Sequence, residues 1–305
     1  MKNSLLLKFR AFFMIAAIMA GAVFFAVPAV AQTAEDDSGP KIVYIIPVEQ
    51  TIETGLHKFL ARAFAEAEEA GADHIILEIN TLGGRVDAAI EIGELIRRSK
   101  IPTVAYIKGK AISAGSYISL NAHQIVMAPG SSIGAAALVT VSGERVEDSK
   151  TIAVWVGLMT AAAEMRERNA QYAAGMVDDQ LVVEVKEIGK TFGKGELITF
   201  NYQEAVKTGY AEAVAANEQE VLSFINAENS RVVRVEMTPA ETLARFLTHP
   251  FVSTLLLLIG ISGVVIELFV PGFGIPGILG VAGFVLYFFG HYAAGFAGVE
   301  HILLF

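Results

Sequence analysis

The last 55 residues of the chain constrain its fold more than any other feature. Residues 251–305 contain no lysine or arginine, and their only carboxylates are Glu267 and Glu300. A membrane-spanning helix needs about 20 predominantly apolar residues, and residues 251–270 and 278–297 supply two such runs around a turn rich in proline and glycine. The sequence therefore predicts a transmembrane region over residues 251–305.

Two details of this region stay open at the level of sequence. Glu267 lies near the end of the first run, where its carboxylate either reaches the membrane interface or serves as a functional group inside the membrane. A third apolar run begins at residue 301 and stops after five residues. The chain is therefore either a natural short form or ends before its membrane region is complete.

The N-terminus has the three parts of a secretory signal. Basic residues precede an apolar stretch at 11–27, and residues 29–31 have the small side chains of a cleavage site. We expect a signal peptide over residues 1–31 and a polar linker over 32–40; the alternative is an uncleaved membrane anchor. In either case the positively charged flank stays in the cytoplasm and the chain that follows is exported.

Composition excludes several classes of function. The chain has no cysteine, which rules out a disulfide scaffold, a thiolate zinc site and a cysteine nucleophile. Its formal net charge is −9, whereas binding to nucleic acid phosphates needs a basic face. We therefore expect no nucleic acid partner. The 53% hydrophobic content also excludes intrinsic disorder.

Between the two ends, residues 41–237 alternate strand and helix patterns. Apolar β-branched runs alternate with stretches whose apolar side chains recur at helical spacing; the strands are expected at 42–48, 74–79, 103–107 and 124–127 and the helices at 52–70, 86–98 and 114–120. This alternation implies right-handed crossovers and a mostly parallel sheet. We expect one α/β domain over residues 41–237, joined to the membrane region by a juxtamembrane segment at 238–250. A further strand at 231–237 is interpreted as the edge of a hairpin.

Parallel sheets bind ligands at the carboxyl ends of their strands, and two loops expected there carry candidate residues. After the second strand, Gly83 and Gly84 let the backbone turn sharply and direct N–H groups into a cleft; the alternative is an ordinary strand-to-helix turn. After the third strand, Ser113 precedes a helix of small residues, where its hydroxyl would lie beside helix N–H groups that suit an oxyanion. The alternative is that Ser113 only caps that helix.

A nucleophilic serine needs a base, and none of the six histidines is well placed. His74 begins a strand, at the end opposite the candidate site. His123 lies beyond the far end of the helix that follows Ser113. A Ser–His–Asp triad is therefore poorly supported.

Lysine is the other candidate base, and it acts only when neutral. Lys150 follows a good helix cap and precedes an apolar helical run. A helix N-terminus disfavours a cation, and apolar surroundings disfavour the charged form, so both favour the neutral amine that a general base requires. Lys108 and Lys110 are rival candidates because they lie close to Ser113 in sequence, and an ordinary solvated lysine is the alternative for Lys150.

Four segments together carry a family resemblance. They are Thr-Leu-Gly-Gly at 81–84, Ser-Ala-Gly-Ser-Tyr at 113–117, Met-Ala-Pro-Gly-Ser-Ser-Ile-Gly at 127–134 and Pro-Gly-Phe-Gly-Ile-Pro-Gly-Ile-Leu-Gly at 271–280. In order and spacing the chain resembles the ClpP/crotonase-type serine peptidases and, more closely, the membrane-bound NfeD family. Each segment alone is unspecific, but the combination is specific, and the resemblance extends from about residue 41 to the end of the chain.

The resemblance implies a ClpP-like spiral domain with a Ser/Lys dyad. Ser113 would be the nucleophile and Lys150 the general base. The backbone N–H groups of Gly84 and Ala114 would form the oxyanion hole, with Gly83 adjoining. Long NfeD proteins continue through further membrane helices into a small OB-fold barrel, which this sequence lacks.

The resemblance also implies partners and a location. NfeD proteins pair with stomatin-like membrane proteins, so a stomatin- or flotillin-like partner is expected, with one of its apolar segments as the substrate. ClpP-like folds usually assemble, which implies at least a homodimer. The chain would be a multi-pass protein of the cell membrane with its protease domain on the extracytoplasmic side, either periplasmic or extracellular.

Three functions from different classes follow. The leading hypothesis is a membrane-anchored serine endopeptidase that needs neither a metal nor an organic cofactor. The alternative is a non-catalytic membrane organiser that binds and arranges stomatin-like proteins. The third is a crotonase-like acyl-CoA enzyme; the export signal and the membrane tail argue against it, because acyl-CoA chemistry is mostly cytosolic.

Overall fold

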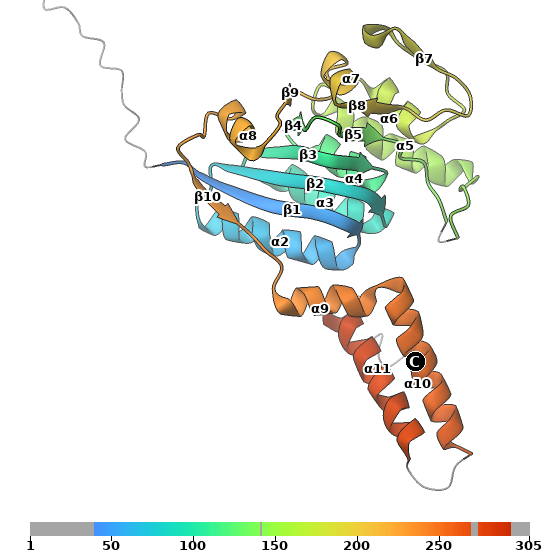
Figure 1. Cartoon of the computed structure of the whole chain (residues 1–305). Helices are drawn as coiled ribbons and strands as arrows, with labels where there is room; N and C mark the ends of the chain where they lie inside the picture. Colours follow the sequence, from blue (N-terminus) through green and yellow to red (C-terminus); the bar gives the residue numbers. More distant parts are fainter. Residues whose placement is uncertain (1–39, 141, 270–273, 294–305) are drawn as a thin grey trace, which may run out of the picture. The chain divides into compact units, whose positions relative to one another are not determined.

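The computed structural model describes residues 40–140, 142–269 and 274–293 (Figure 1). From Pro40 onward the chain forms a compact unit of its own. The expected signal peptide, nearly all of the expected linker and the expected third apolar run lie outside the described residues.

A mostly parallel sheet of eight strands forms the centre of this unit. The strands are β1 (Ile42–Ile52), β2 (His74–Gly84), β3 (Thr103–Ile112), β4 (Gln124–Met127), β5 (Ser132–Gly134), β8 (Thr199–Asn201), β9 (Ala213–Val214) and β10 (Arg231–Arg234). The main path runs β10-β1-β2-β3-β4-β9, and β5 pairs with the end of β3 and with β8. Only the β5–β8 pairing is antiparallel among the described strands of this sheet. The expected α/β class is confirmed.

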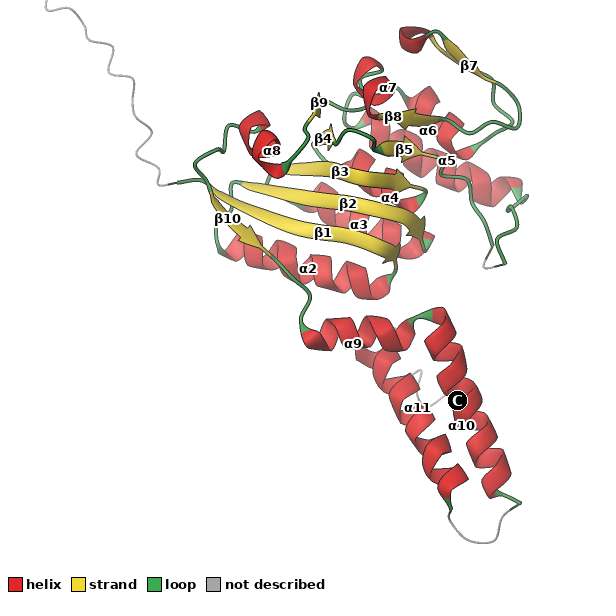
Figure 2. Cartoon of the chain, in the orientation of Figure 1, coloured by secondary structure: helices red, strands yellow, loops and turns green. Residues whose placement is uncertain are grey.

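Helices cover both faces of the sheet, as Figure 2 shows. On one face lie α2 (Thr54–Glu69), α3 (Val86–Arg98) and α4 (Ala114–Asn121), over the larger core, which includes the fully buried side chains of Phe59 and Tyr117. On the other face, α8 (Glu218–Phe224) covers a smaller core around Ile76 and Tyr106. Because both faces are covered, the central strands are apolar on both sides, as parallel strands usually are.

The two strands that lead to the candidate site are longer than their sequence pattern predicts. β2 continues to Gly84 and β3 to Ile112, where loops were expected. Pairing between strands holds these extensions: Thr51 and Ile52 of β1 face Gly83 and Gly84. Glycine has little intrinsic preference for strands, so contact with a neighbouring strand overrides local propensity here.

The strand near the end of the domain corrects one expectation. β10 forms an edge of the sheet, but it pairs in parallel with β1, Ile42 facing Arg231. It is therefore not the edge of a hairpin. A hairpin would need antiparallel pairing with a strand close in sequence, whereas β10 reaches β1 across nearly the whole length of the domain.

A second group of elements lies beyond β5. It comprises α5 (Ser149–Glu164), α6 (Ala170–Val177), α7 (Tyr202–Lys207) and the antiparallel pair β6 (Val183–Val185) and β7 (Lys190–Phe192). An aromatic cluster packs α6 against β8, with the Phe200 ring 5.8 Å from Tyr172 and 5.4 Å from Tyr210 between ring centroids. These elements border the end of β3 because β5 pairs with both β3 and β8.

Three helices follow the sheet: α9 (Pro239–Thr248), α10 (Pro250–Glu267) and α11 (Ile275–Ala293). By length and composition, Ile275–Tyr292 is long and apolar enough to cross a membrane, and Pro239–Thr248 passes together with Phe251–Glu267 as one segment bent by 70°. Helices α10 and α11 approach closely at glycines, since a Cβ on Gly263 would lie 2.5 Å from the Pro276 carbonyl oxygen. Small residues at such contacts are typical of helices that associate in membranes.

Glu267 has a structural role that the sequence did not suggest. Its carboxylate accepts hydrogen bonds from the N–H groups of Gly274 (2.5 Å) and Gly277 (2.8 Å) at the start of α11. The first amides of a helix have no partner within the helix, so this carboxylate satisfies them. Within the described residues, Glu267 thus joins the end of α10 to the start of α11.

Candidate active site

Ser113 lies where β3 ends and α4 begins, as expected. Its backbone has φ 56° and ψ −123°, a conformation with positive φ that costs free energy for any residue with a side chain. The Ser113 N–H donates to the Gly134 carbonyl at 3.1 Å, and the residue is half-buried. A sharp, strained turn between strand and helix is also the device that presents the nucleophilic serine in α/β-hydrolases.

The hydroxyl of Ser113 does not cap α4. Within the described structure it makes no capping bond to the helix amides. The structural hydrogen bonds come from Ser116 instead, whose Oγ lies 2.7 Å from the Ala111 carbonyl oxygen and 2.8 Å from that of Gly134. The capping alternative therefore does not hold here, and the Ser113 hydroxyl remains available for chemistry.

Gly83 lies directly against Ser113. A Cβ added at Gly83 would be 2.6 Å from the Ser113 Cβ and 3.0 Å from its Oγ, and the Gly83 φ is 105°. The Gly83 N–H donates to Thr81 Oγ1 at 2.9 Å, and the Thr81 hydroxyl in turn donates to the Gln50 carbonyl. Gly83 therefore provides space beside the serine, and its own N–H is already engaged.

The N–H of Gly84 points toward the side on which Ser113 lies. Gly84 faces Ile52 in the parallel β1–β2 ladder, and the Ile52 carbonyl accepts from the Arg85 N–H at 2.8 Å. In a parallel ladder, successive residues of a strand direct their N–H groups to alternate sides. Because Arg85 donates to β1, the preceding residue, Gly84, directs its N–H away from β1. For Gly84, the direction away from β1 is the direction of the β3 end and Ser113.

Ala114 is the first residue of α4. Its N–H is one of the first-turn amides, which have no acceptor within the helix, and the helix dipole adds partial positive charge at this end. All eight residues of α4 are buried, so this end of the helix is fixed beside Ser113. Ala114 and Gly84 belong to two elements that are in contact, α4 and β2.

Lys150 has the position in its helix that the sequence predicts. α5 begins at Ser149, and the Asp148 carboxylate caps it by accepting from the Thr151 N–H at 2.8 Å. The Lys150 side chain is exposed, however, and makes no hydrogen bond or ion pair with the described part of the chain. The expected apolar surroundings are therefore missing at its ammonium group, and none of its contacts links it to Ser113.

The two rival candidate bases, Lys108 and Lys110, have different surroundings in the structure. Lys108 pairs with Glu78, Nζ to Oε1 at 3.2 Å, and the Glu78 side chain is only 6% exposed. The Lys108 side chain is therefore engaged by a buried partner on β2. Lys110 is exposed, and its backbone N–H donates to Asn80 Oδ1 at 3.2 Å.

His74 and His123 lie where the sequence places them, at the amino ends of strands and not at the ends that lead to Ser113. His123 Nδ1 accepts from the backbone N–H of Thr103 at 3.1 Å, at the amino end of β3. Burial lowers the pKa of His123, with a smaller contribution from Arg166. Burial likewise lowers the pKa of His74, at the amino end of β2.

Sequence reasoning missed the residues that support the turn. The Thr81 hydroxyl accepts a hydrogen bond from the Gly83 N–H, and Ser116 Oγ bonds to backbone carbonyls of β3 and β5. Ser116 is fully buried, and a serine within a helix of otherwise small and apolar residues is the one signal that would have marked it.

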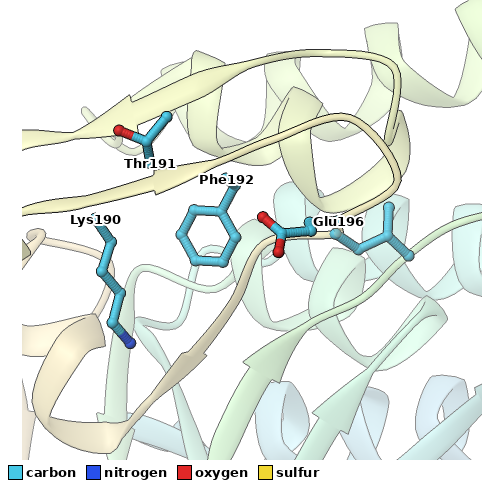
Figure 3. Close-up of a pocket in the computed structure, with 5 residues that line it drawn as sticks. Lys190, Thr191, Phe192 and Glu196 are labelled. Atoms are coloured by element: carbon cyan, nitrogen blue, oxygen red, sulfur yellow. The ribbon is translucent and has the colours of Figure 1, made fainter.

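A cavity of about 480 Å³ beside β7 is separate from this site (Figure 3). Its lining residues are Lys190, Thr191, Phe192, Glu196 and Leu197. The Lys190 ammonium pairs with the Glu204 carboxylate of α7. None of the lining residues belongs to the β3–α4 turn or to the glycine pair at 83–84, so the cavity gives no support to a role in the chemistry of Ser113.

Comparison with known proteins decides the family. The NfeD1b N-terminal domain matches residues 42–235, and the NfeD integral membrane domain matches residues 251–305. The chain belongs to the NfeD family. Its sequence resemblance to that family is therefore confirmed over both the sheet domain and the membrane region.

Two curated relatives cover most of this chain. It is 43% identical over 263 residues to membrane protein NfeD1b of Bacillus subtilis and 30% identical over 275 residues to membrane-bound protease PH1510 of Pyrococcus horikoshii. Each match covers 86% of this chain, but 59% and 62% of the two relatives. The chain thus spans about three fifths of the length of the curated relatives it matches.

Solved structures of one protein resemble the sheet domain. They are of the 1510-N membrane-bound stomatin-specific protease from Pyrococcus horikoshii, 27% identical to this chain. A lysine-to-alanine mutant in complex with a substrate peptide has a TM-score of 0.59 and covers 69% of this chain and 99% of its own. A serine-to-alanine mutant has a TM-score of 0.55 and covers 65% and 99%. The similarity confirms the expected ClpP-like protease fold class.

Proposed function

We propose that this NfeD protein is a membrane-anchored serine endopeptidase with Ser113 as nucleophile and Lys150 as general base. The observation that carries the proposal is the strained turn at Ser113, against which Gly83 packs without a side chain. The relatives support it, because one is named a protease and its mutants replace a serine and a lysine. Those are the two residue types of the proposed dyad.

The proposed reaction uses only groups of the chain and water. The neutral Lys150 amine takes the Ser113 proton while the serine oxygen bonds to the scissile carbonyl carbon. The carbonyl oxygen becomes an oxyanion that the Gly84 and Ala114 N–H groups stabilise. When the C–N bond breaks, the Lys150 ammonium returns the proton to the leaving amine, and water then releases the acyl group with the same lysine as base. The scheme needs no metal or organic cofactor.

We propose a stomatin- or flotillin-like membrane protein as the substrate, cleaved within an apolar segment. The support is the printed specificity of the 1510-N protease for a stomatin homologue. The apolar helices α10 and α11 would keep the domain next to a membrane that such a partner shares. We further propose a multi-pass arrangement with the sheet domain on the extracytoplasmic side, on the basis of the expected signal sequence.

We also propose that the chain forms at least a dimer, through the outer face of α5. This face exposes a row of small and apolar residues: Ala153, Val154, Gly157, Ala161 and Met165. Val154 and Met165 are 59% and 44% exposed. Met159, Ala162 and Ala163 of the same helix are instead buried in the core. A contiguous apolar face exposed on a helix is typical of a protein–protein interface.

A second candidate function is a non-catalytic membrane organiser. One observation favours it: the Lys150 side chain is exposed and makes no hydrogen bond or ion pair with the described residues, so none of these interactions links it to Ser113. In this alternative the domain binds and arranges stomatin-like proteins without cleaving them. The two functions differ in whether Ser113 is needed for turnover.

Peptide hydrolysis separates the two functions. The full chain in detergent micelles is incubated with an apolar peptide, and new amino termini are quantified for the parent and for Ser113→Ala. The protease proposal expects cleavage by the parent and none above background by Ser113→Ala. Equal cleavage by both proteins would exclude Ser113 as the nucleophile, and no cleavage together with retained binding of a stomatin-like protein would support the organiser.

A further inference from the structure

The juxtamembrane helix α9 contacts the end of β1 through one arginine. Arg245 pairs with Glu53, Nε to Oε1 at 2.7 Å, and donates from Nη2 to the Thr51 carbonyl at 3.0 Å. The side chains of Arg245 and Glu53 are only 15% and 18% exposed. The approach is close, because a Cβ on Gly55 would lie 3.0 Å from the Arg245 Cγ.

Glu53 is itself fixed by the start of α2. Its carboxylate accepts from the N–H groups of Gly55 (2.5 Å) and Leu56 (2.9 Å) and so caps that helix. Arg245 therefore binds a preorganised acceptor. A guanidinium that bonds to a carboxylate and a carbonyl at once fixes the geometry between them, which a single point charge does not.

The end of β1 has only one neighbouring strand. β10 pairs with β1 no further than Ile45, whereas the β1–β2 ladder continues to Ile52 after a register shift between Glu49 and Thr51. Ile52 bonds to β2, so the Thr51 carbonyl points to the opposite, unpaired side. Arg245 binds this carbonyl where the described sheet supplies no strand to do so.

The same segment of β1 holds the glycine turn of the proposed site. Thr51 faces Gly83, and Ile52 faces Gly84. The contacts therefore run from α9 through Arg245 and the end of β1 to the Gly84 amide. A cavity of about 930 Å³, whose walls include Thr51, Arg85 and Arg245, adjoins this junction.

We propose that Arg245 is a positioning residue for the Gly84 amide, through which the membrane-attached helix α9 sets the geometry of the oxyanion hole. The proposal rests on the proposed protease function. α9 also packs against α11, so the membrane hairpin is continuous with this chain of contacts. Removing Arg245 frees the end of β1, and a small displacement of a catalytic donor is enough to slow the reaction.

Arg62 provides a matched control. It joins α9 to α2 by binding Glu241 through Nε and Nη2, both at 2.8 Å, and it donates to the Glu236 carbonyl at 3.0 Å. Arg62 thus fixes α9 with at least as many bonds as Arg245 but touches neither β1 nor β2. A general loosening of α9 affects both variants equally, whereas loss of positioning affects only Arg245.

The experiment uses the full chain in detergent micelles with a fluorophosphonate probe that labels reactive serines, and in parallel an apolar peptide substrate. For Arg245→Ala we expect the labelling rate and kcat to fall about tenfold or more. Removing one oxyanion donor outright lowers kcat by about a hundredfold or more, and displacing a donor lowers it less. KM should stay within about twofold, and Arg245→Lys should recover part of the rate. Arg62→Ala should keep its rate within about twofold of the parent.

Hydrogen exchange measured on the same proteins makes the test independent of activity. Arg245→Ala should speed exchange of the amides at residues 83–85 more than Arg62→Ala does, because the Arg85 N–H bond to Ile52 loosens. Equal slowing of labelling in the two arginine variants, or an unchanged rate in Arg245→Ala, overturns the proposal. A parent that does not label refutes the protease function instead; exchange alone then decides, and unchanged exchange at 83–85 overturns the positioning role.

Discussion

The two halves of the proposed dyad are built in opposite ways. Ser113 stands on a buried sheet and a fully buried helix, with a strained backbone and glycine neighbours that leave no room for side chains. Lys150 stands in the first turn of a helix whose start is exposed, and its ammonium makes no hydrogen bond or ion pair with the described residues. In the proposed dyad, the backbone around the serine is therefore fixed by its packing, whereas the lysine side chain is exposed to solvent.

The chain segment that leads to Lys150 shows how this difference arises. The segment between Ala136 and α5 is fixed at two points: the Trp155 indole N–H donates to the Ala136 carbonyl at 2.9 Å, and Arg145 pairs with Asp179. Neither contact involves Lys150. A site with one rigid and one adjustable half is suited to activation by a substrate or by a second copy of the chain.

The largest effect is expected at the nucleophile. Ser113→Ala should abolish fluorophosphonate labelling and lower peptide cleavage by about a thousandfold or more, because the bond-forming oxygen is gone. Thermal unfolding should change little, since the hydroxyl holds no structural bond to α4. Ser142→Ala, at an exposed serine, is the control. Labelling of Ser113→Ala at the parent's rate would show that Ser113 is not the nucleophile.

The next effect is expected at the glycine beside the serine. Gly83→Ala places a Cβ 2.6 Å from the Ser113 Cβ at a φ of 105°, so activity should fall about a hundredfold and stability by about 1–3 kcal/mol. Gly130→Ala is matched to it, because Gly130 has φ 83° and nothing within 4 Å of an added Cβ. It should lose a similar amount of stability from backbone strain and keep its activity. Comparable activity of the two variants would contradict the close packing of the site.

Substitutions of Lys150 and Lys108 are expected to affect different properties, labelling in the first case and stability in the second. Lys150→Ala should lower labelling by about a hundredfold, the usual size of a general-base contribution, and leave thermal unfolding unchanged. Lys108→Ala should do the reverse, because it removes a partner of the buried Glu78 carboxylate, and should cost about 1–2 kcal/mol of stability. If Lys108→Ala loses labelling and Lys150→Ala retains it, the base has been assigned to the wrong lysine.

The smallest effect concerns pH and the helix α9. Hydrogen bonding to the Arg62 guanidinium holds the pKa of Glu241 below its ordinary value of 4.5. The stability from this pair is therefore fully present above pH 4.5 and is lost as the pH falls further through the lowered pKa. Thermal unfolding of the parent and Glu241→Gln should differ at neutral pH and converge in acid. A difference that grows as the pH falls would contradict the assigned sign.

Much of the fold could be predicted from periodicity. The helix predicted at 86–98 and the strand at 124–127 match α3 and β4, since their apolar spacing is strong and local. The extensions of β2 and β3 could not be predicted, because glycines and lysines occupy them and pairing with β1, with β5 and with each other holds them as strands. The same limit explains why β10 was interpreted as the edge of a hairpin and not as a parallel partner of β1.

Part of the candidate site could likewise be predicted from the sequence, and part of it could not. Ser113 and the glycine pair could be predicted, because residues that follow the strands of a parallel sheet meet at one edge. The engaged Gly83 amide and the support from Thr81 and Ser116 depend on side chains meeting across strands, which spacing does not reveal. The surroundings of Lys150 were predicted to be apolar from neighbours on its own helix, but Trp155 and Met159 are buried in the core whereas Lys150 is exposed.

The most direct test of the central claim is covalent labelling of the full chain by the fluorophosphonate probe over a range of about pH 6 to 10, which includes the pH at which a general base operates. Ser113→Ala, Lys150→Ala, Lys108→Ala and Lys110→Ala are measured beside the parent. The account predicts that labelling is lost in Ser113→Ala and Lys150→Ala and kept in the other two. A parent that stays unlabelled at every pH, or a Lys150→Ala protein that labels as fast as the parent, would contradict it.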